Sequence, residues 1–171
     1  MAAMRATIVC CSIVFQCSAI AADPLEGRWI TTDSSGQTTM IELSVDDGVM
    51  TGRIVSIRDQ RGKSIDPICE RCDGDLKGRH VVGAAFIRGL RKSNEKWTGG
   101  KVVDLRDGWT QGVVANCEIT VVDGRARIFG YLKIRLFGAS HEWARIVTDP
   151  APSRPSGMVP LSTTVLRDLR S

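Results

Sequence analysis

Short runs of alternating apolar and polar residues, separated by turn residues, constrain the fold of this chain more than any other feature. An alternation with a period of two predicts a strand that buries one of its faces. Asp-Gly pairs at 47–48, 107–108 and 123–124 lie between such runs, where they favour hairpin turns. The clearest run places one set of side chains on a single face: Val113, Ala115, Cys117, Ile119 and Val121.

About eight runs of this kind lie between Trp29 and Val147. A spacing of roughly 8 to 12 residues is typical of an antiparallel sandwich or barrel, and all six prolines lie outside the runs. One long polar loop at 58–79 interrupts the series, and loops of this length are usually functional or disordered. The expected strands cover 28–32, 39–45, 49–57, 81–90, 96–105, 113–121, 126–136 and 141–147.

The first residues have the composition of a secretory signal peptide. Arg5 precedes an uncharged, mostly apolar stretch, and Ala19-Ile20-Ala21 supplies a small-x-small cleavage site. The apolar stretch is shorter than the roughly 20 residues of a membrane span. We therefore expect removal of residues 1–21, no transmembrane segment afterwards, and a periplasmic or secreted bacterial protein. The domain then occupies 22–148, and a flexible, proline-containing tail at 149–171 can form a short helix.

Charge and composition limit the partners of this domain. The 171 residues carry a net charge of +4, and hydrophobic and charged fractions of 43% and 25% are ordinary for a soluble globular protein. Proteins that bind nucleic acids processively are usually more basic. We therefore expect no nucleic-acid partner.

Three cysteines remain after the expected leader, and two of them form the motif Cys69-Glu70-Arg71-Cys72. A structural disulfide is the favoured interpretation, because it suits an oxidising compartment and would stiffen a long loop. A redox site remains an alternative, although the flanking residues do not resemble the start of a helix. A metal site would need further ligands, for which His80 and Cys117 are the candidates. Cys117 shares the apolar face of its run, which favours a buried, unreactive thiol.

Candidate catalytic groups are scarce. His80 and His141 are the two side chains that titrate near neutrality. Glu142 follows His141, but adjacent residues of a strand point to opposite faces. The chain has no nucleophile elbow, phosphate-binding loop or dinucleotide fingerprint. We therefore expect a protein that is not an enzyme and that uses no cofactor or metal.

Both ends of the domain resemble lipocalins and other calycins. Gly27-Arg28-Trp29 opens the first run, and Trp143-Ala144-Arg145 lies in the last. The resemblance implies that the first and last strands meet and that the guanidinium of Arg145 covers the indole of Trp29. It implies an all-β fold, a single antiparallel up-and-down β-barrel of about eight strands.

A closer resemblance, over about residues 25–147, is to an exported bacterial family known as domain of unknown function twenty-one forty-seven. The family is associated with calycin-like barrels and has no established activity. In this chain Gly138-Ala139-Ser140-His141 stands where members usually have a Gly-Arg-Thr-Gln-type segment. If that segment shapes the barrel mouth, the ligand preference differs here. The resemblance rests on a structural signature of Gly27-x-Trp29, Gly52-x-Ile54, Trp97-x-Gly99-Gly100, Gly130-Tyr131 and Trp143-x-Arg145.

The leading functional hypothesis is an exported β-barrel that binds a small apolar or amphipathic molecule without catalysis. Closed barrels of about eight strands either hold one small ligand or fill with side chains. An alternative is an interaction module of the cell envelope that uses a basic and aromatic strand face. A third hypothesis makes the Cys69–Cys72 loop a redox or metal element. The residues of the basic and aromatic face are Arg125, Arg127, Phe129, Tyr131, Lys133 and Arg135.

Overall fold

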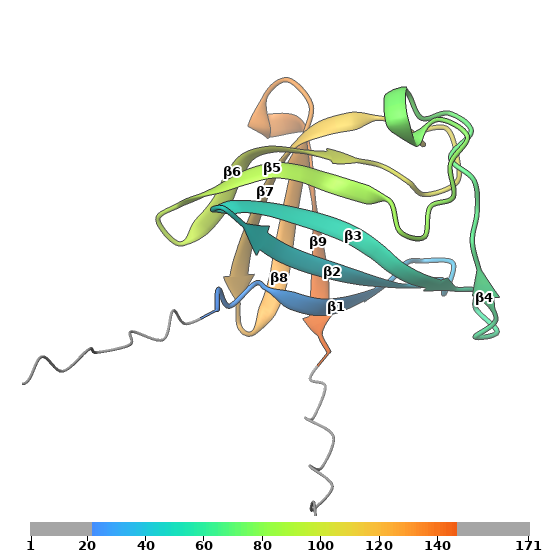
Figure 1. Cartoon of the computed structure of the whole chain (residues 1–171), viewed down its shortest axis with the longest axis horizontal. Coiled ribbons are helices and arrows are strands. Elements are labelled where there is room, and N and C mark those ends of the chain that lie inside the picture. Colours follow the sequence, from blue (N-terminus) through green and yellow to red (C-terminus); the bar gives the residue numbers. More distant parts are fainter. Residues whose placement is uncertain (1–21, 147–171) are drawn as a thin grey trace, which may run out of the picture.

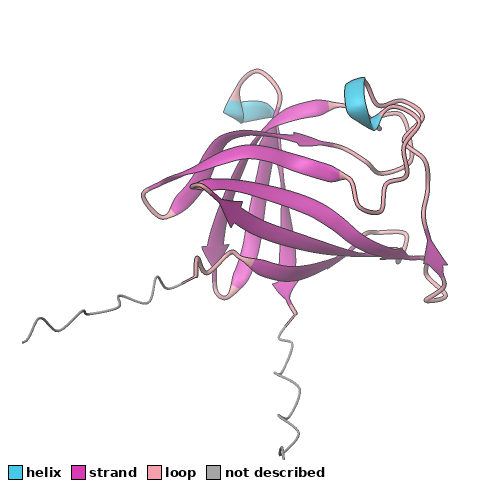
Figure 2. Ribbon diagram, viewed as in Figure 1, coloured by secondary structure: helices cyan, strands magenta, loops and turns pink. Residues whose placement is uncertain are grey.

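The computed structural model describes residues 22–146, which form a β-barrel with two short 3-10 turns (Figures 1 and 2). The leader expected over 1–21 and the tail expected over 149–171 lie outside the described residues. The turns are η1 (Gly74–Leu76) and η2 (Arg135–Phe137). The strands are β1 (Gly27–Thr32), β2 (Thr38–Asp46), β3 (Val49–Arg58), β4 (Ser64–Ile65), β5 (Ala85–Ser93), β6 (Lys96–Val103), β7 (Val114–Val122), β8 (Arg125–Tyr131) and β9 (Gly138–Arg145).

Eight strands close into an antiparallel up-and-down barrel. Each pairs with the next strand of the barrel along the chain, with β3 pairing to β5, and β9 returns to pair with β1. The short β4 pairs only with the end of β3. At the β2–β3 hairpin Asp47 and Gly48 both have positive φ, as a two-residue turn that matches the strand twist requires. The predicted fold class is confirmed.

Alternate residues of each strand point into the barrel and form its core. On β7 the buried Cys117 and Ile119 lie opposite Gly100 and Trp97 of β6, so these four share the inner face. The predicted alternation of β7 therefore gives the correct inner face. The wholly buried side chains include Leu25, Trp29, Leu43, Met50, Ile87, Leu90 and Ile119.

Three strand predictions are wrong in their bounds. The last run, expected at 141–147, already begins at Gly138 and ends at Arg145. The run at 81–90 becomes a strand only from Ala85, because Val81–Ala84 form a turn closed by the Ala84 N–H to Val81 carbonyl hydrogen bond. The run at 126–136 ends at Tyr131, because β9 folds back there and pairs Gly138 with Tyr131. The apolar residues of 132–137 therefore form a hairpin connection instead of an inner face. Leu132, Ile134 and Leu136 are all exposed.

A disulfide and several hydrogen bonds hold the long loop between β3 and β5 in place. A disulfide joins Cys69 to Cys72, and both residues are only 1% exposed. The backbone of Cys69 hydrogen bonds to Gly78 and Arg79 on the returning half of the loop. Gln111, from the β6–β7 loop, accepts a hydrogen bond from the Arg71 backbone N–H at 3.2 Å and so joins the two loops.

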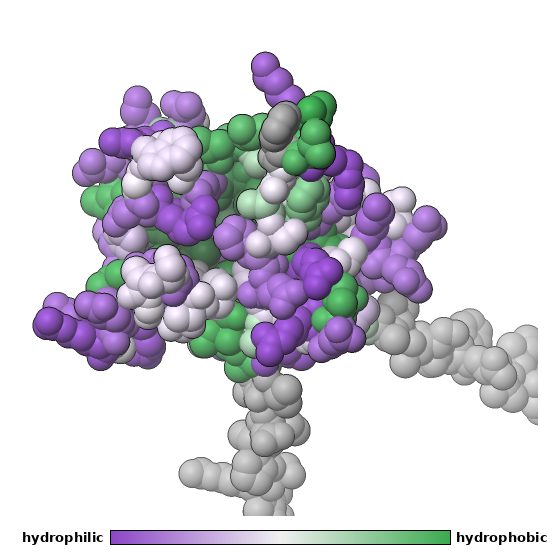
Figure 3. Space-filling model, turned by 180° about the vertical axis from the view of Figure 1, so that it is seen from behind, coloured by the Kyte–Doolittle hydropathy of each residue, from purple (hydrophilic) through white to green (hydrophobic). Residues whose placement is uncertain are grey.

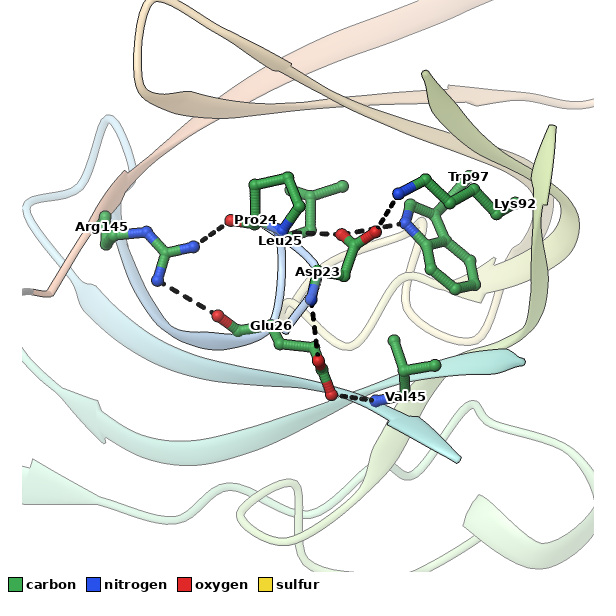
Figure 4. A network of polar contacts seen from close by, with 8 residues as sticks. All are labelled: Asp23, Pro24, Leu25, Glu26, Val45, Lys92, Trp97 and Arg145. Atoms are coloured by element: carbon green, nitrogen blue, oxygen red, sulfur yellow. Dashed lines mark hydrogen bonds and ion pairs between the residues drawn. The ribbon is translucent and has the colours of Figure 1, made fainter. Parts of the chain in front are cut away.

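One end of the barrel is closed by residues 23–26, which we call the closed end (Figure 4). Leu25 is buried, and its carbonyl accepts a hydrogen bond from the Trp29 indole at 2.8 Å. The Arg145 guanidinium lies over the Trp29 ring, 4.6 Å from its centroid. The same guanidinium donates to the carbonyls of Pro24 and Glu26. Arg145 thus joins the last strand to the segment that covers the closed end.

Two carboxylates complete this cover. Asp23 accepts hydrogen bonds from Lys92 and from the Trp97 indole, the latter at 3.2 Å. Glu26 accepts from the backbone N–H groups of Val45 and Asp23, each at 3.1 Å. Burial acts to raise the pKa of Asp23, but hydrogen bonds from Lys92, the Leu25 backbone and Trp97 outweigh it and lower that pKa. The polar groups at the closed end therefore satisfy one another.

Candidate functional site: the open end of the barrel

The opposite end of the barrel, where β9 begins, is built differently, and we call it the open end. Loops 33–37, 59–84, 104–113 and 132–137 lie there, because each follows a strand that runs toward it. β1 and β9 are joined by two residue pairs only, Trp29 with Arg145 and Ile30 with Ala144. In Figure 1, β8 and β9 accordingly stand at a steep angle to β1. The two strands diverge toward the open end.

Inward-facing residues of β9 are accessible in this region. His141 pairs with the buried Ile128, and Trp143 pairs with the buried Ala126, so all four point into the barrel. Trp143 is buried, whereas His141 is exposed. Solvent therefore reaches the inside of the barrel on the open-end side of Trp143.

The inward-facing residues next to His141 are small. Ala139 faces inward opposite Gly130, and neither is buried. A Cβ at Gly130 would lie 3.7 Å from Val102 Cγ1, so this glycine borders β6 across the inner face. Val102 in turn pairs with Ala115 of β7, and both are half-buried. Figure 3, which views the molecule from the β8–β9 side, shows apolar atoms recessed between hydrophilic side chains.

Two aromatic rings pack together close to these positions, one of them on β9. Phe86 and Trp143 face each other with ring centroids 6.2 Å apart and planes tilted by 44°. Both are buried, with exposed fractions of 8% and 5%. Such tilted aromatic pairs contribute to the packing of an apolar interior.

A polar cluster lies at the rim of the open end. The Nε and Nη2 groups of Arg106 donate hydrogen bonds to the two carboxylate oxygens of Asp104, at 2.9 and 2.7 Å. Burial acts to raise the pKa of Asp104, but these hydrogen bonds outweigh it and lower that pKa. Partial desolvation, followed by the positive charge of Arg106, lowers the pKa of His141. His141 is therefore held toward its neutral form, which can donate and accept hydrogen bonds.

His141 and Glu142 do not act together, as the strand pleat predicts. His141 faces the interior, whereas Glu142 faces outward and pairs with Arg127 at 2.9 Å. His80, the other candidate, lies in the β3–β5 loop and pairs with Asp66 at 3.1 Å. The structure thus separates all the candidate acid–base residues that the sequence singled out.

Most of the signature residues lie away from the open end. Gly27, Trp29, Trp97 and Arg145 belong to the closed end, where a Cβ at Gly27 would lie 3.3 Å from Arg145 Nη1.

Three more signature residues have other places in the barrel. A Cβ at Gly100 would lie 2.4 Å from the Arg88 carbonyl oxygen, so this glycine lets β6 approach β5 closely. Gly99, beside it, has a φ of +80°. Tyr131 lies on the outside, stacked on Phe129. Gly130 and Trp143 face the interior toward the open end, and the Ile54 backbone hydrogen bonds to Gly83 and Ala84 of the 59–84 loop there.

The cysteines are placed in two separate settings. Cys69 and Cys72 are bonded and buried in the β3–β5 loop, and Cys117 is buried inside the barrel. Burial raises the pKa of Cys117 to about 12. Within residues 22–146 no three histidine, cysteine or acidic residues are grouped closely enough to hold a metal ion.

The basic and aromatic outer face is shorter than predicted, and two of its four cations are paired within the chain. Lys133 and Arg135 lie beyond the end of β8. Arg135 pairs with Glu118 and lies over the rings of Phe129 and Tyr131, at 5.3 and 5.6 Å. Arg135 is thus already engaged by groups of this chain.

Sequence reasoning missed two features that define the open end. The divergence of β1 from β9 depends on pairing between strands more than 100 residues apart, which leaves no local pattern. The Asp104–Arg106 pair lies in the loop after β6, although residue 104 falls within the expected strand 96–105. The Gly130 and Ala139 pair does leave a signal, since small residues recur at inward positions of the last two strands.

Comparison with solved structures identifies a similar barrel. That structure is described as "Protein HP1028 from the human pathogen Helicobacter pylori belongs to the lipocalin family". It superposes on this chain with a TM-score of 0.58 at 17% sequence identity, over 71% of this chain and 82% of that one. At this identity the similarity concerns the fold alone. No curated protein matches the sequence. Among residues 22–146 no helix is long and apolar enough to cross a membrane.

The sequence also matches one family model over residues 27–145, a range that begins with β1 and ends with β9. That model is described as "Uncharacterized protein conserved in bacteria (DUF2147)". The matched range covers the whole barrel and more than half of the chain. The chain therefore belongs to the DUF2147 family of bacterial proteins.

Proposed function

We propose that the barrel binds one small apolar or amphipathic molecule at its open end and performs no chemistry on it. The observation that carries this proposal is the accessible inner face of β9, where Ala139 and His141 point into the barrel without being buried. A barrel filled by its own side chains would bury these positions. The lipocalin-like fold is compatible with such a role.

The chemistry of the lining supports an amphipathic ligand. Phe86, Trp143 and Val102 offer apolar contacts in the interior. His141 and the Asp104–Arg106 pair at the rim offer hydrogen bonds to a polar end. Sites for small molecules typically combine an apolar lining with a few polar groups that set orientation. We assign no catalytic role to the rim, because Arg106 and Asp104 are engaged with each other.

Native mass spectrometry of the protein purified from the periplasm, compared with its denatured mass, tests this function. A native mass excess that disappears on denaturation is the expected result, and its size identifies the class of ligand. The alternative function, an outer interaction surface, predicts no such excess and binding that weakens with salt. Arg127 and Arg135 are each paired with a glutamate of this chain, which supports binding inside the barrel over this alternative.

We further propose that the protein is exported before it binds its ligand. The signal-like composition of residues 1–21 and the buried Cys69–Cys72 disulfide support an oxidising compartment. The denatured mass of the mature protein should correspond to a chain that starts near residue 22 and carries one disulfide. A full-length mass with three reduced cysteines in the barrel domain would contradict export.

A further inference from the structure

A second hollow lies outside the barrel, between the η1 turn and the outer face of β3 and β5. It is a shallow groove of about 780 Å³. Arginines and a histidine are its ionisable residues, together with one aspartate, and small apolar residues make up much of the rest. The residues that matter here are Arg53, Asp75, Leu76, Arg79, His80 and Arg88.

Positive charge is in excess in this groove. Asp75, the acidic residue of the lining, forms two hydrogen bonds with Arg88, at 3.0 and 2.7 Å. Those hydrogen bonds, the largest cause, lower the pKa of Asp75 and keep it ionised. Arg53 uses one N–H on the Gly83 carbonyl, at 3.2 Å, and keeps its other donors. Arg79 has no acidic partner within 4.0 Å among the described residues.

The wall that carries Arg79 is fixed in place. The Arg79 carbonyl accepts a hydrogen bond from the backbone N–H of Cys69 at 2.9 Å, and Cys69 is held by the disulfide to Cys72. His80, the next residue, forms an isolated antiparallel β-bridge with Ile68 of the same loop. The disulfide therefore orders the strand-like pair that presents Arg79 to the groove. A site ordered before binding loses less entropy when a ligand arrives.

We propose that this groove binds an oxyanion, a phosphate or carboxylate group, through the guanidinium groups of Arg53 and Arg79. Guanidinium groups present planar pairs of donors that match such oxygens. The buried Leu76 and the half-buried Val82 and Ala84 border the same groove and contact the carbon part of the ligand. This site is separate from the barrel interior and does not depend on the function proposed for the open end.

Titration of the oxidised full barrel with inorganic phosphate, followed by amide chemical shifts at constant ionic strength, tests the proposal. Saturable shifts are expected at residues of η1 and of 79–85. Arg79→Gln and Arg53→Gln should each weaken binding about tenfold, the order expected when one hydrogen bond between charged groups is lost. Arg91→Gln is the matched control, because Arg91 is an exposed arginine of β5 that does not line the groove.

Three outcomes would overturn the proposal. These are shifts that do not saturate, equal weakening by Arg91→Gln, and shifts confined to the barrel interior. Hexyl phosphate serves as a second probe, and tighter binding than inorganic phosphate is expected if the apolar border contacts the ligand. Equal affinity would contradict that contact.

Replacement of both Cys69 and Cys72 by serine should weaken phosphate binding several-fold in a barrel that stays folded by circular dichroism. Unchanged affinity would contradict the role of the disulfide.

Discussion

The two ends of this barrel share the same strands but differ in how their polar and apolar groups are matched. At the closed end Trp29 is wholly buried, and the carboxylates of residues 23–26 have partners on three strands. At the open end inward-facing Ala139 and His141 remain accessible, and β1 no longer pairs with β9. The same pleat therefore produces a packed core at one end and an accessible interior at the other.

This difference underlies our proposal that the open end binds a ligand while the closed end stabilises the fold. The following predictions compare residues of the two ends, beginning with the largest expected effect, and one further prediction concerns the interior.

Replacement of Trp29 should separate the two ends most strongly. Trp29→Ala removes a buried ring and should lower the free energy of unfolding by about 3–5 kcal/mol. Trp109, in the β6–β7 loop, is 84% exposed, and Trp109→Ala should change that free energy by less than about 0.5 kcal/mol. Urea denaturation of both variants measures the difference. Similar losses would show that the closed end is not the stabilising one.

The two arginines provide a smaller contrast. Arg145→Ala loses hydrogen bonds to two backbone carbonyls and the contact with the Trp29 ring, which should cost about 1–3 kcal/mol. Arg106→Ala loses an ion pair in which the arginine side chain is 57% exposed, and such pairs contribute about 1 kcal/mol or less. Thermal and urea unfolding should rank the variants in this order. The reverse ranking would show that the more stabilising arginine contacts lie at the open end.

The strand faces and the hairpin turns could be predicted from local patterns, and the resemblance to calycins implied the meeting of Trp29 with Arg145. The cover of the closed end could not be predicted, since Asp23 meets Trp97 across 74 residues of sequence. The run from Ala126 also misled, because Leu132, Ile134 and Leu136 continue its alternation beyond the end of β8. Period-two patterns indicate a face but not where a strand turns back.

Acidification should affect the open end before the closed end. The pKa of His141 lies below its ordinary 6.5, so the folded state favours the neutral ring. Its contribution to stability is present above pH 6.5 and is lost as the pH falls through the lowered value. Amide shifts of residues 104–106 and 139–143 should therefore move first in a titration downward from pH 8. His141→Gln should abolish that early transition.

Asp23 gives the matching result at the closed end. Its pKa lies below 3.8, so its contribution to stability persists until the pH falls through that lower value. Asp23→Asn should remove part of the acid dependence below about pH 4 while the transition of His141 stays unchanged. If the closed end loosens first, the assignment of the two ends is wrong.

Cys117 should show the least reactivity, because its thiol is buried inside the barrel and burial raises its pKa to about 12. It should not react with a thiol reagent at pH 8 in the native protein and should react fully in urea. Reaction at the same rate in both states would show that the interior opens as far as β7.

Binding of the apolar fluorescent probe N-phenylnaphthylamine to two matched variants tests the central claim most directly. Ala139→Phe places a ring inside the open end above Gly130, whereas Ala144→Phe places the same ring on the outer face of the same strand. We predict saturable binding by the unsubstituted protein, at least about tenfold weaker binding by Ala139→Phe, and little change for Ala144→Phe, since a filled site forfeits its apolar contacts. Equal affinity of all three proteins would show that the probe binds elsewhere and would contradict a ligand site inside the barrel.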